Sequence, residues 1–501
     1  MVSNNYILAM YDIRSKQSFI YRSSAIKEIA GGSLLIRDCF KDYLYPAAER
    51  ISNKGKGIFH TEWSDNVDFT RTGFEQHLKE GYIGELIYEG GGNFLVVYRD
   101  IDAYRDINYE FSKKILEDIG TLQVLPTFIK GVNFDDYPGD RDKLYAKHTI
   151  EEGMQSYISP WGTLPIVQVD YSTSEPLTDR IEEGNRTVKL SKENAAKRKK
   201  YTQADKTGEF YLNVKLLDDM VQKRGEESLL AVIYADGNNM GAKVESCIKG
   251  LKTYEECIKA LRYFSADIQK KYIDDRVNEI FEHLEKKYGE KGRQRLVVGS
   301  GDEITFICNA RHAYDLVNVY LGGLPENCSA CAGIAVFHSH APYAEAYRIA
   351  EECCEQGKKY MRNNNITDAC FIDSYYCQGS IGTSLEEMRE EETGDFISKP
   401  WRVGDSENTE DTKRREYSTK DVEKCVKALN ELGRSNVKGL AEAAKDGALE
   451  LTFELKRIRA HMKKEKRDNV EWEFLADNPS LVYDVVTFYD IWFDDGKAGV
   501  K

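Results

Sequence analysis

The sequence contains no apolar run that approaches the roughly 20 residues of a membrane-spanning helix. Its start, MVSNNYILAMYDIRSKQ, also lacks the basic region and the apolar core of a signal peptide. No second CxxC motif accompanies Cys328 and Cys331, so the ligand set of a structural zinc site is incomplete. From these absences we expect a cytoplasmic protein that binds no membrane.

The 11 cysteines of the chain, without secretory features, indicate reduced thiols. Cys328 and Cys331 belong to CSACAGIAVF, which has the pattern of a buried strand. Positions three apart on a strand point to opposite faces, which does not suit two ligands of one ion. We interpret them as small buried apolar side chains, and a zinc site is the alternative.

The chain also lacks an excess of positive charge, since 84 Asp and Glu outnumber 70 Lys and Arg and the formal net charge is −14. Such a chain does not bind nucleic acid over its whole surface, so any contact has to be local. One segment, RTVKLSKENAAKRKKY, carries seven Lys or Arg residues. It is either a solvated linker or helix, or a patch that contacts phosphates.

At 501 residues the chain has room for two to four domains. In its second half, the apolar run 228–235 ends at Asp236, and a long helix is expected from Thr253 to Tyr288. A hairpin around Ser300-Gly301-Asp302, a helix, a strand and another helix follow. This order predicts a split βαβ, or ferredoxin-like, sheet.

The first half repeats that order. It has a strand at 5–12, a helical stretch interrupted by Gly31-Gly32, a glycine-rich hairpin at 84–98, a helix at 101–119 and a closing strand. Asp12 then corresponds to Asp236. We therefore predict an α+β fold with two tandem ferredoxin-like (βαββαβ) palm domains and a helical C-terminal domain. The expected domains are a degenerate first palm (1–165), a charged linker or helical segment (166–226), a second, catalytic palm (227–380) and a loop and helical C-terminal domain (381–501).

Three carboxylates of the second half are expected to converge. The first strand of a ferredoxin-like sheet neighbours the hairpin, so Asp236 should lie near Asp302 and Glu303. Such carboxylates repel unless a cation lies between them, and oxygen ligands suit Mg²⁺ or Mn²⁺. Two such ions can clamp the attacking and leaving oxygens of a phosphoryl transfer. The alternative is an ordinary acidic turn at the surface.

Glycines and one lysine complete this candidate site. Gly237 and Gly301 would let the backbone approach phosphates closely, and Lys358 on the last helix is the best candidate to meet a triphosphate. The first-half hairpin carries Gly90–Gly92 and Asn93 instead of paired carboxylates, so that copy should not catalyse.

Several stretches resemble one family. SGDEI resembles the GGDEF signature of diguanylate cyclases, and the wider context resembles the polymerase/cyclase-like large subunit of type III CRISPR effector complexes. The matching stretches are QSFIYRSSAIKEIAGGS, YEGGGNFLVVY, YADGNNMG, VVGSGDEITFIC, CAGIAVFHSHAPYAEAYRIAEECCEQGKKY and KPWRV. In that family the second of two palm domains condenses ATP into 3′–5′ linked, often cyclic, oligoadenylates.

The resemblance places the family's metal-binding aspartate on Asp236 and its paired acidic positions on Asp302 and Glu303. Ser300-Gly301 replaces a Gly-Gly pair, and Asn238 stands at a second acidic position. The implied metal ligands are Asp236, Gly237, Asp302 and Glu303. The implied nucleotide-binding residues are Gly237, Asn238, Asn239, Ser300, Gly301 and Lys358.

Three functions are compatible with these residues. The first is an Mg²⁺- or Mn²⁺-dependent nucleotidyltransferase that makes a nucleotide second messenger from ATP or another NTP in antiviral defence. The second is a scaffold whose palm no longer turns over, and the third is another palm chemistry, such as template-directed polymerisation. The resemblance implies RNA and other effector subunits, or a second copy of the chain, as partners. Because no His-Asp dipeptide occurs, we expect no DNase of that type.

Overall fold

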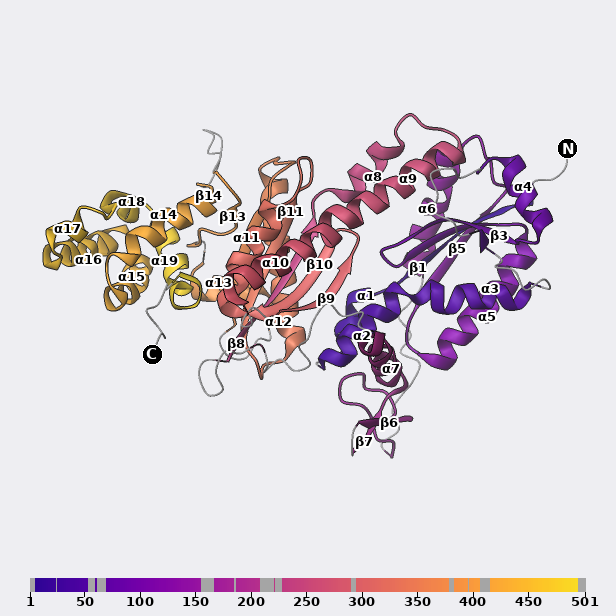
Figure 1. Cartoon of the computed structure of the whole chain (residues 1–501), viewed down its shortest axis with the longest axis horizontal. Coiled ribbons are helices and arrows are strands. Elements are labelled where there is room, and N and C mark those ends of the chain that lie inside the picture. Colours follow the sequence, from indigo (N-terminus) through magenta and orange to yellow (C-terminus); the bar gives the residue numbers. More distant parts are fainter. Residues whose placement is uncertain are drawn as a thin grey trace. The chain divides into compact units, whose positions relative to one another are not determined.

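The computed structural model describes residues 5–23, 25–52, 59–60, 69–154, 166–183, 186–207, 220, 228–289, 294–377, 383–394, 396–405 and 415–493. Within these ranges, no helix is both long enough and apolar enough to cross a membrane. The chain divides into two compact units, one of Met1–Phe210 with Met240–Lys270 and one of Tyr211–Asn239 with Lys271–Lys501. Each unit contains a palm-type sheet with helices against it (Figure 1).

The sheet of the first unit has the order β2-β3-β4-β1-β5. Its strands are β1 (Ile7–Ile13), β2 (Phe59–His60), β3 (Gly84–Gly90), β4 (Asn93–Tyr98) and β5 (Val124–Lys130). Strands β3, β4, β1 and β5 pair antiparallel, and β2 adds a short parallel pair at the edge. The order β5-β1-β4-β3 is that of a ferredoxin-like sheet, so the predicted fold of the first palm is confirmed.

Helices cover both faces of this sheet, and its strands carry apolar residues at consecutive positions, as in residues 7–11 of β1, so that both faces are apolar. The helical elements are α1 (Lys16–Tyr21), α2 (Ile26–Arg37), η1 (Phe40–Leu44), α3 (Tyr45–Ile51), α4 (Arg71–Glu80), α5 (Ile101–Asp118), α6 (Tyr137–Met154), α7 (Lys192–Thr207), α8 (Met240–Ile248) and α9 (Tyr254–Gln269). Leu8 and Met10 face a core built with α4, α6, α8 and α9. On the opposite face, Tyr11 packs against Phe40 and Phe111.

The expected break at Gly31-Gly32 is wrong, because α2 runs through both glycines. A Cβ on Gly31 would lie 1.9 Å from the backbone carbonyl oxygen of Lys197 in α7. The glycines therefore permit a close helix–helix contact and do not end the helix.

Helix α7 and the hairpin of β6 (Asp179–Glu183) and β7 (Arg186–Leu190) hold the basic segment of the sequence. Three of its seven cations have partners in the first unit. Lys197 pairs with Glu193 at 2.6 Å, Arg198 with Glu28 at 2.7 Å, and Lys200 with Asp38 at 2.7 Å. These contacts favour a role in helix docking for this part of the segment over a phosphate patch.

The single helix expected over 253–288 is interrupted. Thr253 and Glu256 form the predicted capping box at the start of α9, but a π-helical turn, η3 (Lys270–Asp274), separates α9 from α10 (Asp275–Tyr288). The boundary between the compact units falls at this turn. Helix α9 packs on the first palm, where the Arg262 Nε donates to the carbonyl of Ile87 at 3.0 Å.

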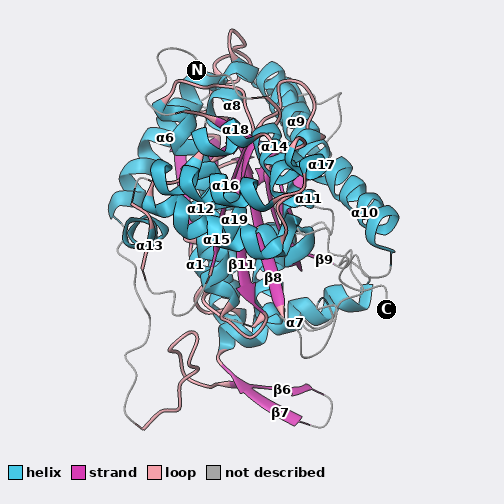
Figure 2. Cartoon of the chain, turned by 90° about the vertical axis from the view of Figure 1, so that its left-hand side faces the viewer, coloured by secondary structure: helices cyan, strands magenta, loops and turns pink. Residues whose placement is uncertain are grey.

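The second unit repeats the strand order of the first and extends it. Its sheet has the order β14-β13-β12-β11-β8-β10-β9. The strands are β8 (Leu229–Gly237), β9 (Gln294–Ser300), β10 (Glu303–Asn309), β11 (Ala330–His338), β12 (Phe371–Tyr376), β13 (Trp401–Arg402) and β14 (Tyr417–Ser418). β8 and β11 lie side by side in Figures 1 and 2 and are paired antiparallel. The order β11-β8-β10-β9 confirms the second ferredoxin-like palm.

Helices of the second unit cover this sheet and build the C-terminal region. They are α10, η5 (Ala310–His312), α11 (Ala313–Gly322), α12 (Tyr343–Asn363), α13 (Leu385–Glu392), α14 (Thr419–Asn430), α15 (Arg434–Asp446), α16 (Ala448–His461), α17 (Lys464–Arg467), α18 (Trp472–Asp477), α19 (Pro479–Thr487) and η6 (Tyr489–Phe493). The predicted helical C-terminal region is confirmed, while the predicted domain boundaries stay a prediction. The carboxylate of buried Asp484 in α19 accepts a hydrogen bond from the Ser398 hydroxyl at 2.7 Å, which attaches this region to the palm.

Candidate active site at the tip of the second-palm hairpin

A two-residue turn joins β9 to β10. Ser300 pairs with Glu303, so Gly301 and Asp302 form the loop between them. Gly301 has a φ of 66°, a conformation that glycine adopts at little cost. The turn therefore places the Asp302 side chain at the very tip of the hairpin, next to the first residue of β10.

The pairing of β8 with β10 brings a second carboxylate to this tip. Asp236, near the end of β8, lies directly opposite Glu303 in the antiparallel register. Residues opposite each other in such a pair have side chains on the same face of the sheet. The three carboxylates that the sequence singled out, on Asp236, Asp302 and Glu303, are thus brought together at one end of two neighbouring strands.

Electrostatics reflect this proximity. Burial raises the pKa of Asp302 to about 6, and the nearby carboxylate of Asp236 contributes to the increase. A raised pKa means that burial and the negative charge of Asp236 favour the protonated form of the Asp302 carboxyl. A nearby positive charge would oppose this effect. A cation bound at the tip would therefore stabilise the charged form of Asp302.

Lys358 of α12 brings a cation to this site. Its ammonium group contacts the Asp236 carboxylate and donates a hydrogen bond to the carbonyl of Gly237 at 3.2 Å. Burial by itself would lower the pKa of Lys358, but the attraction of Asp236 outweighs it and the pKa is raised. Helix α12 is held on this face of the sheet partly by the edge-to-face packing of Tyr347 on Tyr234, with ring centroids 5.6 Å apart.

The predicted nucleotide-binding residues other than Lys358 lie at the end of β8, in the loop after it or at the hairpin. Asn238 is only 4% exposed, and its side-chain amide donates to the backbone carbonyl of Ala369 at 2.9 Å. Asn239 follows with a φ of 57°, in the left-handed region. These contacts hold the loop after β8 in shape. Gly237 and Gly301 stand beside the carboxylates, at the ends of β8 and of the hairpin.

The first palm has the same register with different side chains. Asp12 lies opposite Asn93, as Asp236 lies opposite Glu303. Both loop residues of its hairpin, Gly91 and Gly92, have positive φ values, of 57° and 78°. Gly92 therefore takes the place of Asp302, and the two-residue turn of this hairpin carries no acid.

A lysine that we did not single out occupies this space in the first palm. The Lys16 ammonium donates to the carbonyl of Gly91 at 2.5 Å and lies 3.4 Å from the carboxylate of Asp12. A Cβ on Gly92 would lie only 2.5 Å from Cε of Lys16. Its position four residues after Asp12 is the signal that could have identified it.

The donors at the second tip fit a hard divalent cation in chemical type, since all are oxygens. Asp236 is close enough to Asp302 to contribute to the raised pKa of the Asp302 carboxyl. Among the described residues, however, no three His, Cys, Asp or Glu side chains are arranged to hold a metal ion. A cation here would be held by Asp236 and Asp302 once Lys358 moved away from Asp236.

No family model matches this sequence, and no curated protein matches it. Among solved structures, a chain of the Csm1-Csm4 cassette in complex with pppApApA aligns over 96% of this chain and 70% of its own length, at 12% identity and a TM-score of 0.51. The cassette with AMPPNP aligns over 97% of this chain and 70% of its own length, at 12% identity and a TM-score of 0.49.

The cassette with cA4 aligns over 79% of this chain at 13% identity and a TM-score of 0.44, and this chain spans only 59% of that chain's length. A likeness at such low identity is a likeness of fold. This chain therefore shares its fold with a chain of the Csm1-Csm4 cassette.

Proposed function

We propose that the second palm is a divalent-metal-dependent nucleotidyltransferase that condenses ATP, or another NTP, into 3′–5′ linked, cyclic oligonucleotides. The observation that carries this proposal is the placement of Asp236 opposite Glu303, with Asp302 beside them at the hairpin tip. Carboxylates gathered at the end of two strands are the arrangement that a metal-bound triphosphate requires.

Each residue has a defined task in this proposal. Asp236 and Asp302 hold the cation, which when bound withdraws charge from the phosphoryl group under attack. Lys358 exchanges its contact with Asp236 for the triphosphate, whose charge it then helps to neutralise. Gly301 has no side chain at the tip and leaves the backbone there open to a phosphate.

The shared fold supports the same chemistry. The Csm1-Csm4 cassette with that fold was crystallised with pppApApA, a linear adenylate with a 5′ triphosphate. By analogy we assign nucleoside triphosphates as substrates, and RNA and other effector subunits as partners, in a cytoplasmic antiviral complex. The correspondence between fold and function is an analogy, so the site residues carry the proposal.

One observation favours a second candidate, a scaffold subunit with an inactive palm. Asp236 already has a cation partner in Lys358, and the amide of Asn238 is bound to the protein. In a scaffold, these contacts would be permanent and the palm would serve assembly alone.

Turnover separates the two candidates. The purified protein is incubated with each labelled NTP and either Mg²⁺ or Mn²⁺, with and without target RNA and co-purified subunits, and the product masses are measured. Oligonucleotide products that disappear in D302A/E303A support the nucleotidyltransferase. Absence of product under all these conditions, in a protein that still assembles with its partners, supports the scaffold.

A further inference from the structure

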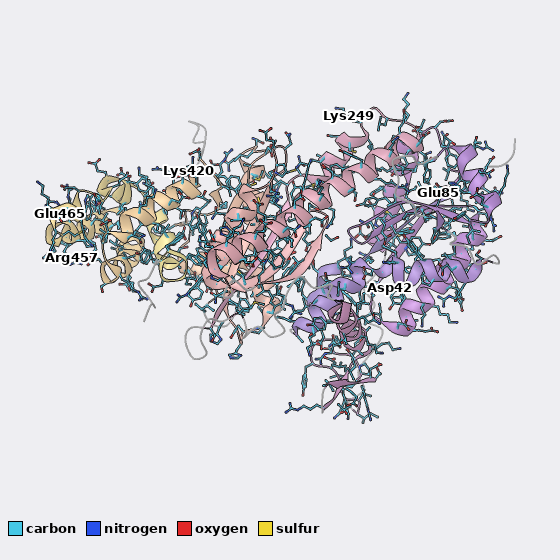
Figure 3. All side chains as sticks on the ribbon, in the orientation of Figure 1. Asp42, Glu85, Lys249, Lys420, Arg457 and Glu465 are labelled. Atoms are coloured by element: carbon cyan, nitrogen blue, oxygen red, sulfur yellow. The ribbon has the colours of Figure 1, made fainter. Side chains whose placement is uncertain are left out.

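The C-terminal helical region carries a strongly basic surface on a chain that is acidic as a whole. Residues 455–467, LKRIRAHMKKEKR, contain seven Lys or Arg and one Glu, a net charge of +6 in a chain of −14. They form the end of α16, the turn after it and α17. Figure 3 shows the labelled side chains of Arg457 and Glu465 at the outside of these helices.

Among the described residues, ion pairs involve two of these seven cations. Arg457 pairs with Glu454 at 2.6 Å, and Arg467 lies 3.7 Å from Asp468. The exposed lysines of this surface differ from these two arginines. In the described part of the chain, no ion pair involves Lys456, Lys463, Lys464 or Lys466. In α7, by contrast, Lys197, Arg198 and Lys200 are bound within the protein. The charge on the C-terminal surface is available to an outside partner.

Two large apolar side chains stand on the same helix. Leu451, Leu455 and Ile458 form the buried face of α16. On its outer face, Leu449 is 82% exposed and Phe453 is 72% exposed. Lys456 and Arg457 follow Phe453 at positions i+3 and i+4, so an exposed aromatic ring lies beside two cations.

An exposed aromatic ring beside a lysine, on a helix that leads into a run of further exposed lysines, matches the chemistry of one class of ligand. Single-stranded nucleic acid offers phosphates to the cations and unpaired bases that stack on aromatic rings. An acidic protein surface would use the lysines but would gain nothing specific from a ring in this position. The combination therefore favours nucleic acid.

We infer that the basic surface of α16 and α17, with Phe453, binds single-stranded nucleic acid. The four lysines contact the phosphate backbone, and the ring of Phe453 stacks on a base. This role is independent of catalysis at the hairpin of the second palm. Because the chain as a whole is acidic, it needs a local basic surface to bind a polyanion, and this surface provides one.

Binding of a fluorescent 20-nucleotide RNA, and of the DNA of the same sequence, tests this role by anisotropy without nucleotide. The variant K456Q/K463Q/K464Q/K466Q should weaken binding strongly and lower the salt-dependence slope of log Kd by about 3, since each single-strand phosphate contact contributes about 0.7. The matched control is K113Q/K130Q/K249Q/K259Q, which removes four exposed lysines of the first unit.

A second pair of variants tests stacking without any change of charge. F453A should weaken binding about tenfold, whereas L449A, on the same face, should have little effect because an aliphatic side chain cannot stack. Equal losses in the two lysine variants would overturn the inference, since binding would then be diffuse. Polyglutamate that binds as tightly as RNA, with F453A unaffected, would instead identify an acidic protein as the partner. Thermal melts check that every variant is folded.

Discussion

Asp236 and Glu303 face each other across paired strands at the position where Asp12 and Asn93 face each other in the first palm. The shared register shows that the two palms position equivalent residues in the same way. The two palms differ in the charges at these positions. In the second palm, Asp302 lies beside Asp236 and Glu303. In the first palm, Gly92 stands in place of Asp302, and the side chain of Lys16 lies against it. This difference assigns the proposed chemistry to the second palm.

Replacing Asp302 and Glu303 with alanine should abolish the proposed synthesis without reducing the stability of the fold. Because burial and Asp236 disfavour ionised Asp302, D302A/E303A should melt at the same temperature as wild type in EDTA, or slightly higher. It should lose the thermal stabilisation that Mg²⁺ with a nucleotide gives by mass action, and synthesis should fall by at least about 10³-fold. Differential scanning fluorimetry and product analysis measure these effects.

The control for this variant is E390A/E391A, which removes two adjacent exposed acids from α13. It should retain both synthesis and the response to Mg²⁺ with nucleotide. If D302A/E303A unfolds, or keeps near-normal synthesis, the hairpin tip is a structural turn.

The sequence was sufficient to predict the four-stranded core of each sheet and the neighbourhood of Asp236 and Glu303, but not the added strands β2, β12, β13 and β14. Strands such as β8 are short apolar runs that end at an aspartate, and the small loop at Gly301 marks the hairpin. Since a ferredoxin-like sheet has one strand order, these signals already imply that Asp236 neighbours Glu303. The helix cap at Thr253 could also be predicted from the sequence, because a capping box depends only on residues close together in the chain.

Contacts between elements far apart in the sequence could not be predicted in the same way. An amphipathic helix shows which face is buried but not which sheet buries it, so the assignment of α9 to the first unit could not be predicted. The buried contact of Arg262 with the carbonyl of Ile87 follows from that assignment. Likewise, Gly31 resembled a helix break because its close approach to Lys197 involves residues far apart in the sequence.

Lys358 should matter for binding of the triphosphate. K358M removes the ammonium group beside Asp236, so we expect KM for the nucleotide to rise about tenfold with a smaller change in kcat. The control is K359M, because Lys359 is half exposed and pairs with Glu386 at 3.2 Å. Equal kinetics for the two variants, measured by steady-state product formation, would remove Lys358 from the site.

A buried histidine gives the second unit a dependence on pH. Burial lowers the pKa of His312 to about 4, although Asp315 opposes the shift, and the ring stacks on Tyr288 with centroids 3.8 Å apart. Between about pH 6.5 and 4 the unfolded chain therefore binds more protons, so stability present above pH 6.5 is lost as the pH falls. The loss amounts to at most about 3 kcal/mol.

The variant H312F keeps an aromatic ring at this position and removes the titration. Its unfolding free energy, measured by urea denaturation at several pH values, should fall less than that of wild type between pH 6.5 and 4. At pH 8, where His312 is neutral in both states, the two proteins should show similar slopes. Identical pH profiles would mean that His312 ionises freely in the folded protein.

The first palm should not carry out the chemical step. Lys16 already neutralises Asp12, and the tip formed by Gly91 and Gly92 has no acid, so D12A should leave kcat within about twofold of wild type. An effect on KM would indicate that this palm contributes to nucleotide binding. The matched comparison is D236A, the equivalent position in the second palm, which should abolish synthesis. If D12A instead abolished turnover in a folded protein while D302A did not, the roles of the two palms would be reversed, because the acids at the second tip would then be dispensable.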